Sequence, residues 1–455
     1  MNYADFEALA FSNTGLLTIY WIVGFSCLFL LTRKYSRGLF VDPFHFYYTF
    51  TYGTSYGVVA LLATMGLIDL DAFWIVFCFG AIFLISYRFF LKTDVINFRR
   101  LVNSVWLPTQ LQEKSILVMM LIYVILAIAN LSVAGFGFLA ESRFESTIGY
   151  GPIIRVVEPL RLLLTAWFGL KIVKRWQSGK DYFFFSILLI FFILFSSLLN
   201  GAKFAFLEGF YAIAIAVIVA KIKFKISSMR LYFFWGALIV VIMFFTLFVL
   251  RYNISSTGGD PFAESQSIVG VPVLVERFIG RIMWNGDMYF LSLPNEVYKH
   301  ISIDNFITRF ATAIFGSQLV SPIVGYDAAQ HEVGRLIWLY WAPDDDVMRG
   351  PTNHFDLTAY FYFGPIFGIF FVIVLALVLS QFNRLIFTRD ASDDYRAIIV
   401  SVLWCKAVSM LMHPAAGFAW CIDVVFILII CKSISIAISK NNIEPSTDDR
   451  RTELN

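Results

Sequence analysis

Charged residues are scarce in this chain of 455 residues. Lys, Arg, Asp and Glu together make up 15% of it, and the formal net charge of +3 is spread along the sequence. We therefore expect no nucleic-acid partner, because such binding needs a concentrated basic face. The first residues, MNYADFEALAFSN, include acidic residues and no Lys or Arg. We also expect no secretory signal peptide, since such a peptide begins with a positively charged segment.

Cysteine is also rare, and its positions argue against two kinds of site. All five cysteines lie within apolar runs: Cys27, Cys78, Cys405, Cys421 and Cys431. None stands in a polar loop with a partner nearby, so the sequence predicts no disulfide framework and no metal site built on cysteine. The acidic run Asp344–Asp346 is also interpreted as a solvated loop rather than a metal site, because consecutive side chains point in different directions.

Apolar residues take the place of the missing charge. The chain is 59% hydrophobic and 18% aromatic, with a mean hydropathy of +0.74. A soluble core cannot bury that much apolar surface, whereas a bilayer can, and a membrane-spanning helix needs about 20 mostly apolar residues. The sequence predicts an all-α, polytopic membrane protein with eleven transmembrane helices, at residues 13–32, 44–67, 72–91, 115–134, 153–173, 182–200, 204–220, 231–250, 357–381, 397–413 and 418–438.

Lys and Arg are distributed unevenly between the segments that connect these spans. The segments after odd-numbered spans hold most of them: Arg33, Lys34, Arg37, Arg88, Lys92, Arg99, Arg100, Lys114, Lys171, Lys174, Arg175, Lys180, Lys221, Lys223, Lys225, Arg230, Arg384, Arg389, Arg396, Arg450 and Arg451. Loops rich in Lys and Arg stay in the cytoplasm. The sequence therefore predicts an N-terminus outside and a C-terminus in the cytoplasm.

This orientation assigns the one long extramembrane segment, residues 251–356, to the outer side. Loops of this length in a compact protein are usually functional or disordered, and a content rich in Trp, Phe, Ile and Val argues against disorder. The loop also holds three of the five histidines: His300, His331 and His354. The predicted organisation is eight spans in residues 1–250, a loop with amphipathic helices at 251–356, three spans in 357–438 and a cytoplasmic tail at 439–455.

Two stretches of the loop combine helical spacing with basic side chains. Arg277 and Arg281 are four residues apart in VPVLVERFIGRIMW, and His331 and Arg335 have the same spacing in AQHEVGRLIWLYW. Paired guanidinium groups suit a diphosphate, because each planar fork matches two phosphate oxygens and stays charged. The alternative is a surface role, since amphipathic helices resting on a membrane carry Arg on their wet side. A histidine such as His331 can likewise be an ordinary hydrogen-bonded loop residue.

Ionisable residues inside the predicted spans are costly and therefore informative. They occur in the fifth span, around the turn before the seventh and in the last two spans: Arg155, Glu158, Arg161, Lys203, Glu208, Lys406 and Asp423. Opposite charges can simply hold neighbouring helices together, which is the alternative for Glu158 and Asp423. Arg155, Arg161 and Lys203 exceed what such pairing needs, so we expect an anion near them.

Two local motifs and the general layout resemble a known family. RGPTNHFDLTAYFYFGPIFGI (349–369) places Arg349, His354 and Asp356 directly before an apolar run. It resembles the segment by which the large loop of Wzy-type oligosaccharide repeat-unit polymerases re-enters the membrane. LLNGAKFAFLEGFYAIAIAVIVA (198–220) is similar to the small-residue turn with a basic residue that precedes a middle span. The sequence departs from the pattern in having Lys rather than Arg in that turn, and Asn353–His354 where apolar residues are usual.

The resemblance implies a metal-independent glycosyltransferase without a cofactor. Such a polymerase transfers a glycan from undecaprenyl diphosphate to a fresh lipid-linked repeat unit, at the periplasmic face of the bacterial inner membrane. The implied partners are that oligosaccharide, membrane lipid, a chain-length regulator and the flippase of the pathway. The nearest alternatives are an O-antigen ligase, which differs in its acceptor, and a lipid-linked oligosaccharide transporter or flippase.

The resemblance also implies roles for the residues singled out above. Seven basic side chains would bind the diphosphate: Arg155, Arg161, Lys203, Arg277, Arg281, Arg335 and Arg349. Fixed positive charge stabilises the departing diphosphate more in the transition state than in the ground state. The attacking hydroxyl needs a base within hydrogen-bond reach, and the predicted catalytic residues are His331, His354 and Asp356.

Overall fold

The computed structural model describes residues 1–35, 41–135, 150–200, 203–222, 228–256, 258–265, 267–387 and 393–441, and within them it is helical throughout. Each predicted span coincides with a helix or with consecutive short helices. These are α2 (Thr14–Thr32), α3 (Pro43–Phe46) with a π-helical stretch (Tyr47–Thr51) and α4 (Tyr52–Thr64), α5 (Leu70–Phe90), α7 (Thr109–Ala134), α8 (Gly151–Gln177), α9 (Phe183–Asn200), α10 (Lys203–Val219), α11 (Ser228–Ser256), α18 (Phe355–Phe387), α19 (Asp394–Val408) and α20 (Pro414–Asn441). The predicted all-α fold is confirmed for the described residues.

Five of the described helices are long and apolar enough to cross a membrane. They comprise Thr14–Thr32, Leu70–Phe90, Thr109–Val133, Phe355–Phe387 and Pro414–Ser439. The chain is therefore an α-helical, membrane-embedded protein. The apolar parts of α9 and α10 are shorter, and α8 carries several charges. Their passage through the bilayer, and the total of eleven spans, stay a prediction.

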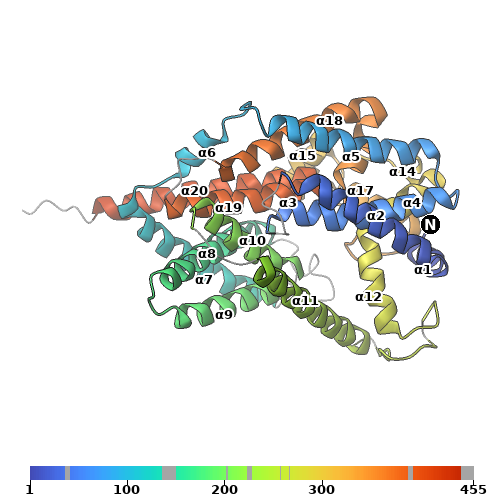
Figure 1. The fold of residues 1–455 in the computed structure, drawn as a ribbon. Coiled ribbons are helices and arrows are strands. Elements are labelled where there is room, and N and C mark those ends of the chain that lie inside the picture. Colours follow the sequence, from blue (N-terminus) through green and yellow to red (C-terminus); the bar gives the residue numbers. More distant parts are fainter. Residues whose placement is uncertain are drawn as a thin grey trace, which may run out of the picture.

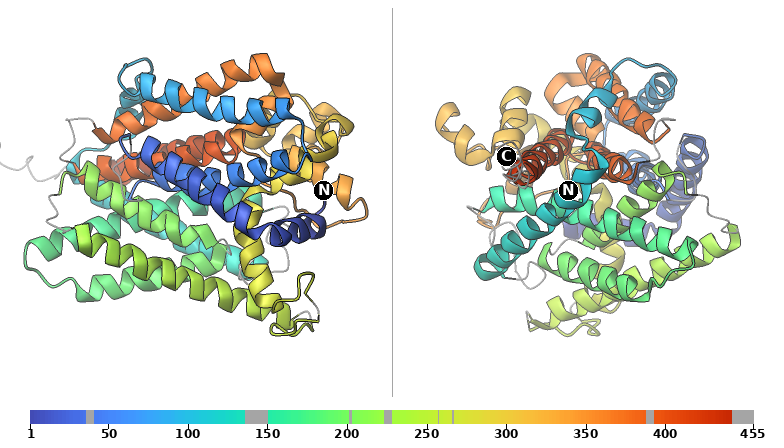
Figure 2. Two further views of the ribbon diagram at one scale, coloured as in Figure 1. Left: turned by 45° about the vertical axis from the view of Figure 1, so that its right-hand side comes forward. Right: turned by 90° about the vertical axis from the view of Figure 1, so that its left-hand side faces the viewer.

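Short helices gather at one end of this bundle. The N-terminal helix α1 (Tyr3–Ser12) lies there with α12 (Val273–Met283), α14 (Val297–His300) and α17 (Val333–Trp341), whereas α6 (Phe98–Val105) and the last turns of α20 lie at the other end (Figure 1). Figure 2 shows the same grouping from two further directions. The predicted loop thus folds as a set of short helices, which also includes α13 (Asp287–Ser292), α15 (Phe306–Phe315) and α16 (Ser317–Val324).

Helix α18 is divided by a kink that separates its first turns from the apolar remainder. Gly364 has φ 69° and ψ −175°, a conformation that a residue with a Cβ rarely adopts. Pro365 follows, and its missing N–H cannot continue the hydrogen-bond ladder of the preceding turn. The stretch 355–363 therefore forms a short helix of its own, directly after the segment in which the loop returns to the bundle.

Candidate functional site

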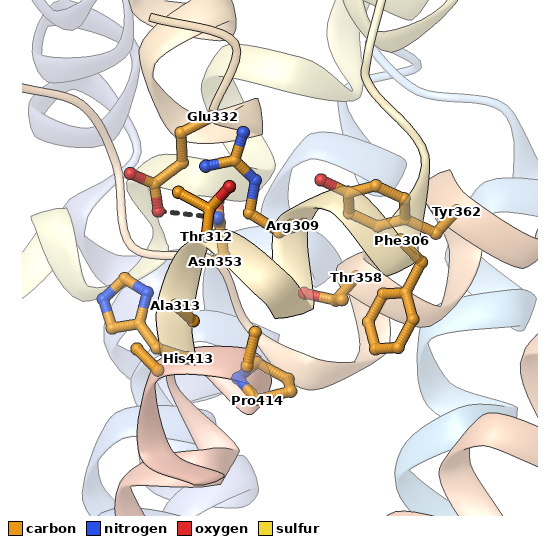
Figure 3. Close-up of a pocket in the computed structure, with 12 residues that line it drawn as sticks. Phe306, Arg309, Thr312, Ala313, Glu332, Asn353, Thr358, Tyr362, His413 and Pro414 are labelled. Atoms are coloured by element: carbon orange, nitrogen blue, oxygen red, sulfur yellow. Dashed lines mark hydrogen bonds between the residues drawn. The ribbon is translucent and has the colours of Figure 1, made fainter. Parts of the chain in front are cut away.

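A pocket of about 190 Å³ lies where the loop helices meet the ends of α18 and α20. Its polar wall includes side chains from α15, from the start of α17, from the segment before and into α18, and from the residue before α20: Arg309, Thr312, Glu332, Asn353, Thr358 and His413 (Figure 3). Phe306 and Tyr362 form an aromatic edge. The pocket thus combines charged and hydrogen-bonding groups with an apolar rim.

Helix α15 presents Arg309 and Thr312 to the pocket because three residues bring side chains back to the same helical face. The helix begins at a good cap, since the Asn305 side chain accepts a hydrogen bond from the Thr308 N–H at 2.7 Å. It ends at Gly316, which has φ 87°. The cap and the glycine together set the ten-residue length of this helix.

Arg309 is nearly buried, and its guanidinium is only partly used within the protein. One terminal nitrogen donates to the Asp304 carboxylate at 2.6 Å and to the Ala328 carbonyl at 2.8 Å. Its Nε is buried without a hydrogen-bond partner among the described residues. Buried polar groups in native proteins nearly always have a partner, so an unpaired one needs an explanation.

Asn353 supplies the complementary unpaired group. Its Nδ2 donates to Glu332 Oε1 at 3.4 Å, the contact drawn as a dashed line in Figure 3. Its Oδ1 is buried and has no donor in the part of the chain that the structure describes. The pocket is therefore lined by residues with one unpaired donor and one unpaired acceptor, and by the Glu332 carboxylate.

A buried cluster surrounds Asp356, a predicted catalytic residue that lies in sequence between the lining residues Asn353 and Thr358. The Tyr289 hydroxyl lies 2.8 Å from each carboxylate oxygen of Asp356, and the Tyr56 hydroxyl lies 3.2 Å from one of them. The Tyr289 hydroxyl also lies 3.3 Å from Nδ1 of His354. Both His354 and Asp356 are 0% exposed. The structure thus brings the two predicted residues together, but in the interior rather than on the wall of the pocket.

The environment of His354 keeps its imidazole neutral. Burial lowers the pKa of His354 to about 3, and the nearby charge of His413 lowers it further. A neutral ring suits a packed position between Tyr52 and Tyr289, whose rings both lie 5.1 Å from it. The neighbouring residue, Asn353, faces the pocket instead. This difference of one residue is invisible to sequence reasoning, because the segment before α18 has no regular period.

The predicted diphosphate pair on α12 remains accessible. Arg277 and Arg281 are both exposed, and the Arg281 guanidinium lies 4.9 Å from the ring centroid of Trp284. Partial burial lowers the pKa of Arg281, and so does the like charge of Arg277. The two charges therefore influence each other, as the i, i+4 spacing predicted. Their role as a diphosphate clamp stays a prediction.

Arg335, also predicted to bind diphosphate, contacts the protein's own backbone. It is 5% exposed, and it donates to the Val347 carbonyl at 2.7 Å, to the Asp345 carbonyl at 2.5 Å and to Gln330 Oε1 at 3.0 Å. These bonds fasten the loop after α17 to that helix. Predicted catalytic His331 lies nearby, half-buried, with Nδ1 2.9 Å from the Asp327 carbonyl.

Arg349 and the acidic run form a separate surface contact. The Arg349 side chain is 55% exposed, pairs with the Asp345 carboxylate at 2.5 Å and lies 4.9 Å from the Trp338 ring centroid. Asp345 thus has a cation and the Trp338 N–H as partners. Among the described residues there is no group of three or more His, Cys, Asp or Glu side chains that could hold a metal ion.

Arg155 and Arg161, which lie inside the predicted spans, are neutralised by carboxylates. Arg155 forms a two-pronged contact with Asp423, at 2.9 and 2.6 Å, and also donates to a backbone carbonyl of α15. Arg161 is 2% exposed and contacts Glu158 and Glu208 at 2.8 and 2.7 Å.

Lys406 of α19 completes this network, 3.1 Å from Glu208. Two cations and two carboxylates therefore balance around Arg161. The expectation of unpaired positive charge at Arg155 and Arg161 is not met, because carboxylates on neighbouring helices supply their counter-charges. The side chain of Lys203, the third residue of that expectation, lies outside the described residues.

Sequence reasoning missed the residues that line the pocket. Arg309 and His413 lie next to apolar or turn residues with no motif around them, and Glu332 adjoins His331 in a stretch for which only the basic side chains were considered. One signal was available for Arg309. It stands at i, i+3 from Thr312 on a mostly apolar helix, so that two polar groups share one face.

Comparison of the chain with protein-family models, with curated protein sequences and with solved structures finds no match. The functional interpretation therefore rests on the chemistry of the pocket, on the helical layout and on the two local motifs.

Proposed function

We propose that this protein is a membrane-embedded glycosyltransferase that polymerises oligosaccharide repeat units carried on undecaprenyl diphosphate. One observation carries the proposal: residues lining the pocket combine a guanidinium with an unpaired N–H, a carboxylate, and an amide with an unpaired oxygen. The pocket lies beside membrane-embedded helices, where a lipid-linked substrate could keep its tail in the bilayer. Sugars and diphosphates offer the acceptors and hydroxyl donors that these groups lack.

The reaction assigns roles to four of the polar lining residues. The acceptor hydroxyl of one repeat unit forms a new bond to the anomeric carbon of the donor glycan, and the bond from that carbon to the lipid diphosphate breaks. Glu332 takes the proton from the attacking hydroxyl, as a general base must. The positive charge of Arg309 stabilises the leaving diphosphate, which keeps the bonding electrons. Asn353 and Thr358 position the sugar through hydrogen bonds.

The proposal includes a topology. The chain would cross the bacterial inner membrane eleven times, with a periplasmic N-terminus, a cytoplasmic C-terminus and the pocket at the periplasmic side. The chain-length regulator and the flippase of the pathway would be its partners. Reporter fusions test this arrangement: one after Lys180 should report the cytoplasm, and one inserted near Gly259 should report the periplasm. The reverse pattern would place the pocket on the cytoplasmic side and contradict the proposed topology.

The surface polysaccharide of a deletion strain distinguishes the candidate functions. Loss of a polymerase leaves single repeat units on the lipid acceptor, loss of a ligase leaves none, and loss of a flippase traps them inside the cell. The purified protein should also polymerise a lipid-linked repeat unit in excess EDTA, because Arg side chains neutralise the diphosphate in this proposal. Activity lost to EDTA and restored by magnesium or manganese would contradict that part.

A transporter or flippase is the second candidate, and the charge network around Arg161 favours it. Transporters use buried ionisable groups along their pathways. Reconstituted vesicles separate the two candidates: a polymerase extends repeat units supplied on its own side, whereas a flippase moves them across without extending them.

A further inference from the structure

Helices α15 and α16 expose large apolar side chains, which is unusual for a protein surface in water. On α15 the polar residues Thr308 and Arg309 face the protein, at 8% and 9% exposure, whereas α16 also exposes Gln318. The large apolar residues of the two helices face outward, at 80% exposure for Ile307, 62% for Phe315, 65% for Leu319 and 83% for Ile323. A helix at a water-facing surface buries its apolar side and exposes its polar side. Something other than water must therefore cover this face.

The outward face continues into the surface of the membrane-embedded helices. Phe306 of α15 packs on Phe363 and Phe371 of α18, with ring centroids 5.0 and 5.4 Å apart. The exposed side of α18 close to these residues is itself apolar, with Ile366 70% and Phe370 64% exposed. The apolar surface of α15 thus adjoins a surface that lipid covers.

The far end of α15 reaches a second membrane-embedded helix. Phe310 packs on Phe418 of α20 at 5.1 Å between centroids. The Ile314 carbonyl accepts a hydrogen bond from Arg155, which also binds Asp423. Asp423 lies about two and a half turns into α20, at 3.6 residues per turn. Helix α15 therefore lies alongside α20 at the depth of its apolar turns, not above its end.

The dimensions fit insertion into one leaflet. Helix α15 has ten residues and α16 has eight, which correspond to about 15 and 12 Å at 1.5 Å per residue. The hydrocarbon core of a bilayer is about 30 Å thick, so neither helix can cross it. Gly316, with φ 87°, lies between them and allows the chain to turn.

We propose that α15 and α16 form a hairpin embedded in the hydrocarbon of the leaflet at the N-terminal end of the bundle. Lipid acyl chains cover the face made by Ile307, Phe315, Leu319 and Ile323. The opposite face of α15 lines the pocket, so the pocket and the lipid lie on the two sides of one helix. A ligand with a long apolar tail can then keep its tail in the lipid while its polar part occupies the pocket. The placement of the hairpin does not depend on the proposed enzymatic activity.

Site-directed spin labelling of the full-length protein in lipid vesicles tests this placement. In the background, Ser replaces the exposed residues Cys27 and Cys78, while the three buried cysteines are retained and checked for absence of labelling. Labels are placed by Leu319→Cys and Ile323→Cys on the hairpin. Phe370→Cys serves as the lipid-facing reference and Asp344→Cys as the water-facing reference in the same loop.

Labels on the hairpin should collide with oxygen, which dissolves in lipid, severalfold more than with a water-soluble nickel chelate, as the Phe370→Cys label does. Access to the nickel chelate equal to that of the Asp344→Cys label would overturn the proposal. So would low access to both reagents, which would show that protein covers the face. Spin–spin broadening between copies would identify that protein as a second copy of this chain.

Discussion

Two groups of polar and charged side chains in this protein differ in how completely their hydrogen-bonding atoms are paired. Around Arg161, in the middle of α8, two cations and two carboxylates pair with one another at 2.7–3.1 Å. In the pocket, Arg309 and Asn353 each keep an unpaired polar atom. The charged groups around Arg161 are paired with one another, whereas the two pocket residues each have a polar atom without a partner among the described residues. The comparison suggests that the first group holds helices together and that the second group binds.

The energetic reasons for the two groups also differ. Buried charges in a low-dielectric interior must be compensated, and removing one partner exposes the full cost of the other. An unpaired buried donor or acceptor costs about 1–3 kcal/mol. Arg309 and Asn353 combine such unpaired atoms with a place in the lining of a cavity, so the pocket is the better candidate for chemistry even though the network holds more charge.

Arg161→Leu should have the largest effect. It removes the cation that contacts both Glu158 and Glu208, and breaking a buried ion pair costs about 3–5 kcal/mol. The measurement is thermal stability and yield of the detergent-solubilised protein. Lys174→Met on the same helix removes a largely exposed pair with Asp394 and should cost less than about 1 kcal/mol. A stable but inactive Arg161→Leu protein would show that the group around Arg161 serves activity rather than helix packing, and it would favour transport.

Glu332→Gln should abolish most activity while leaving the fold intact. The amide keeps the size of the side chain and its contact with Asn353 but cannot take a proton, and general bases contribute about 10²–10⁴-fold. Polymer formation in the complemented deletion strain gives the readout, with a blot for protein level. Glu264→Gln, at an exposed site of the same loop, is the matched control. Normal polymer from Glu332→Gln would remove Glu332 from the mechanism.

Arg277→Lys and Arg281→Lys test whether anion binding extends beyond the pocket, because this pair is accessible yet lies outside the pocket lining. If the pair binds diphosphate, lysine keeps the charge but loses the planar fork. A lost charge-assisted hydrogen bond costs roughly 1.5–3 kcal/mol, or about ten- to a hundredfold in rate. Polymer length and amount are measured for both variants and for the two alanine variants. Full-length polymer from all four would confine anion binding to the pocket.

Asp287→Asn should change stability only through its dependence on pH. Burial raises the pKa of Asp287 from 3.8 to about 7, against a hydrogen bond from Tyr3 that lowers it. Between about pH 4 and 7 the folded protein therefore holds a proton that the unfolded chain has released. Raising the pH through this window should destabilise the wild type relative to Asp287→Asn, by at most about 1.4 kcal/mol per pH unit. Unfolding followed at pH 4.5, 5.5, 6.5 and 7.5 checks this, and parallel profiles for the two proteins would contradict it.

The helices were predictable to a large extent, and the site was not. Long and mostly apolar runs such as 115–134 and 418–438 lie within α7 and α20, because length and hydropathy are local properties of the chain. The predicted catalytic residues show the limit. His354 and Asp356 are buried together with Tyr289, while Asn353 and Thr358 line the pocket. Sequence proximity located the right segment, but side-chain direction there depends on packing.

From the sequence alone it follows that this chain forms apolar helices and that charge is unevenly divided between its connecting segments. Each of these properties depends on neighbours a few residues apart. Only the tertiary structure decided which charges cancel. Arg161 meets Glu208 from another helix, and the pocket brings Arg309 of α15 together with Asn353 before α18. These contacts join residues tens of positions apart in the sequence, and they depend on how whole helices pack against one another.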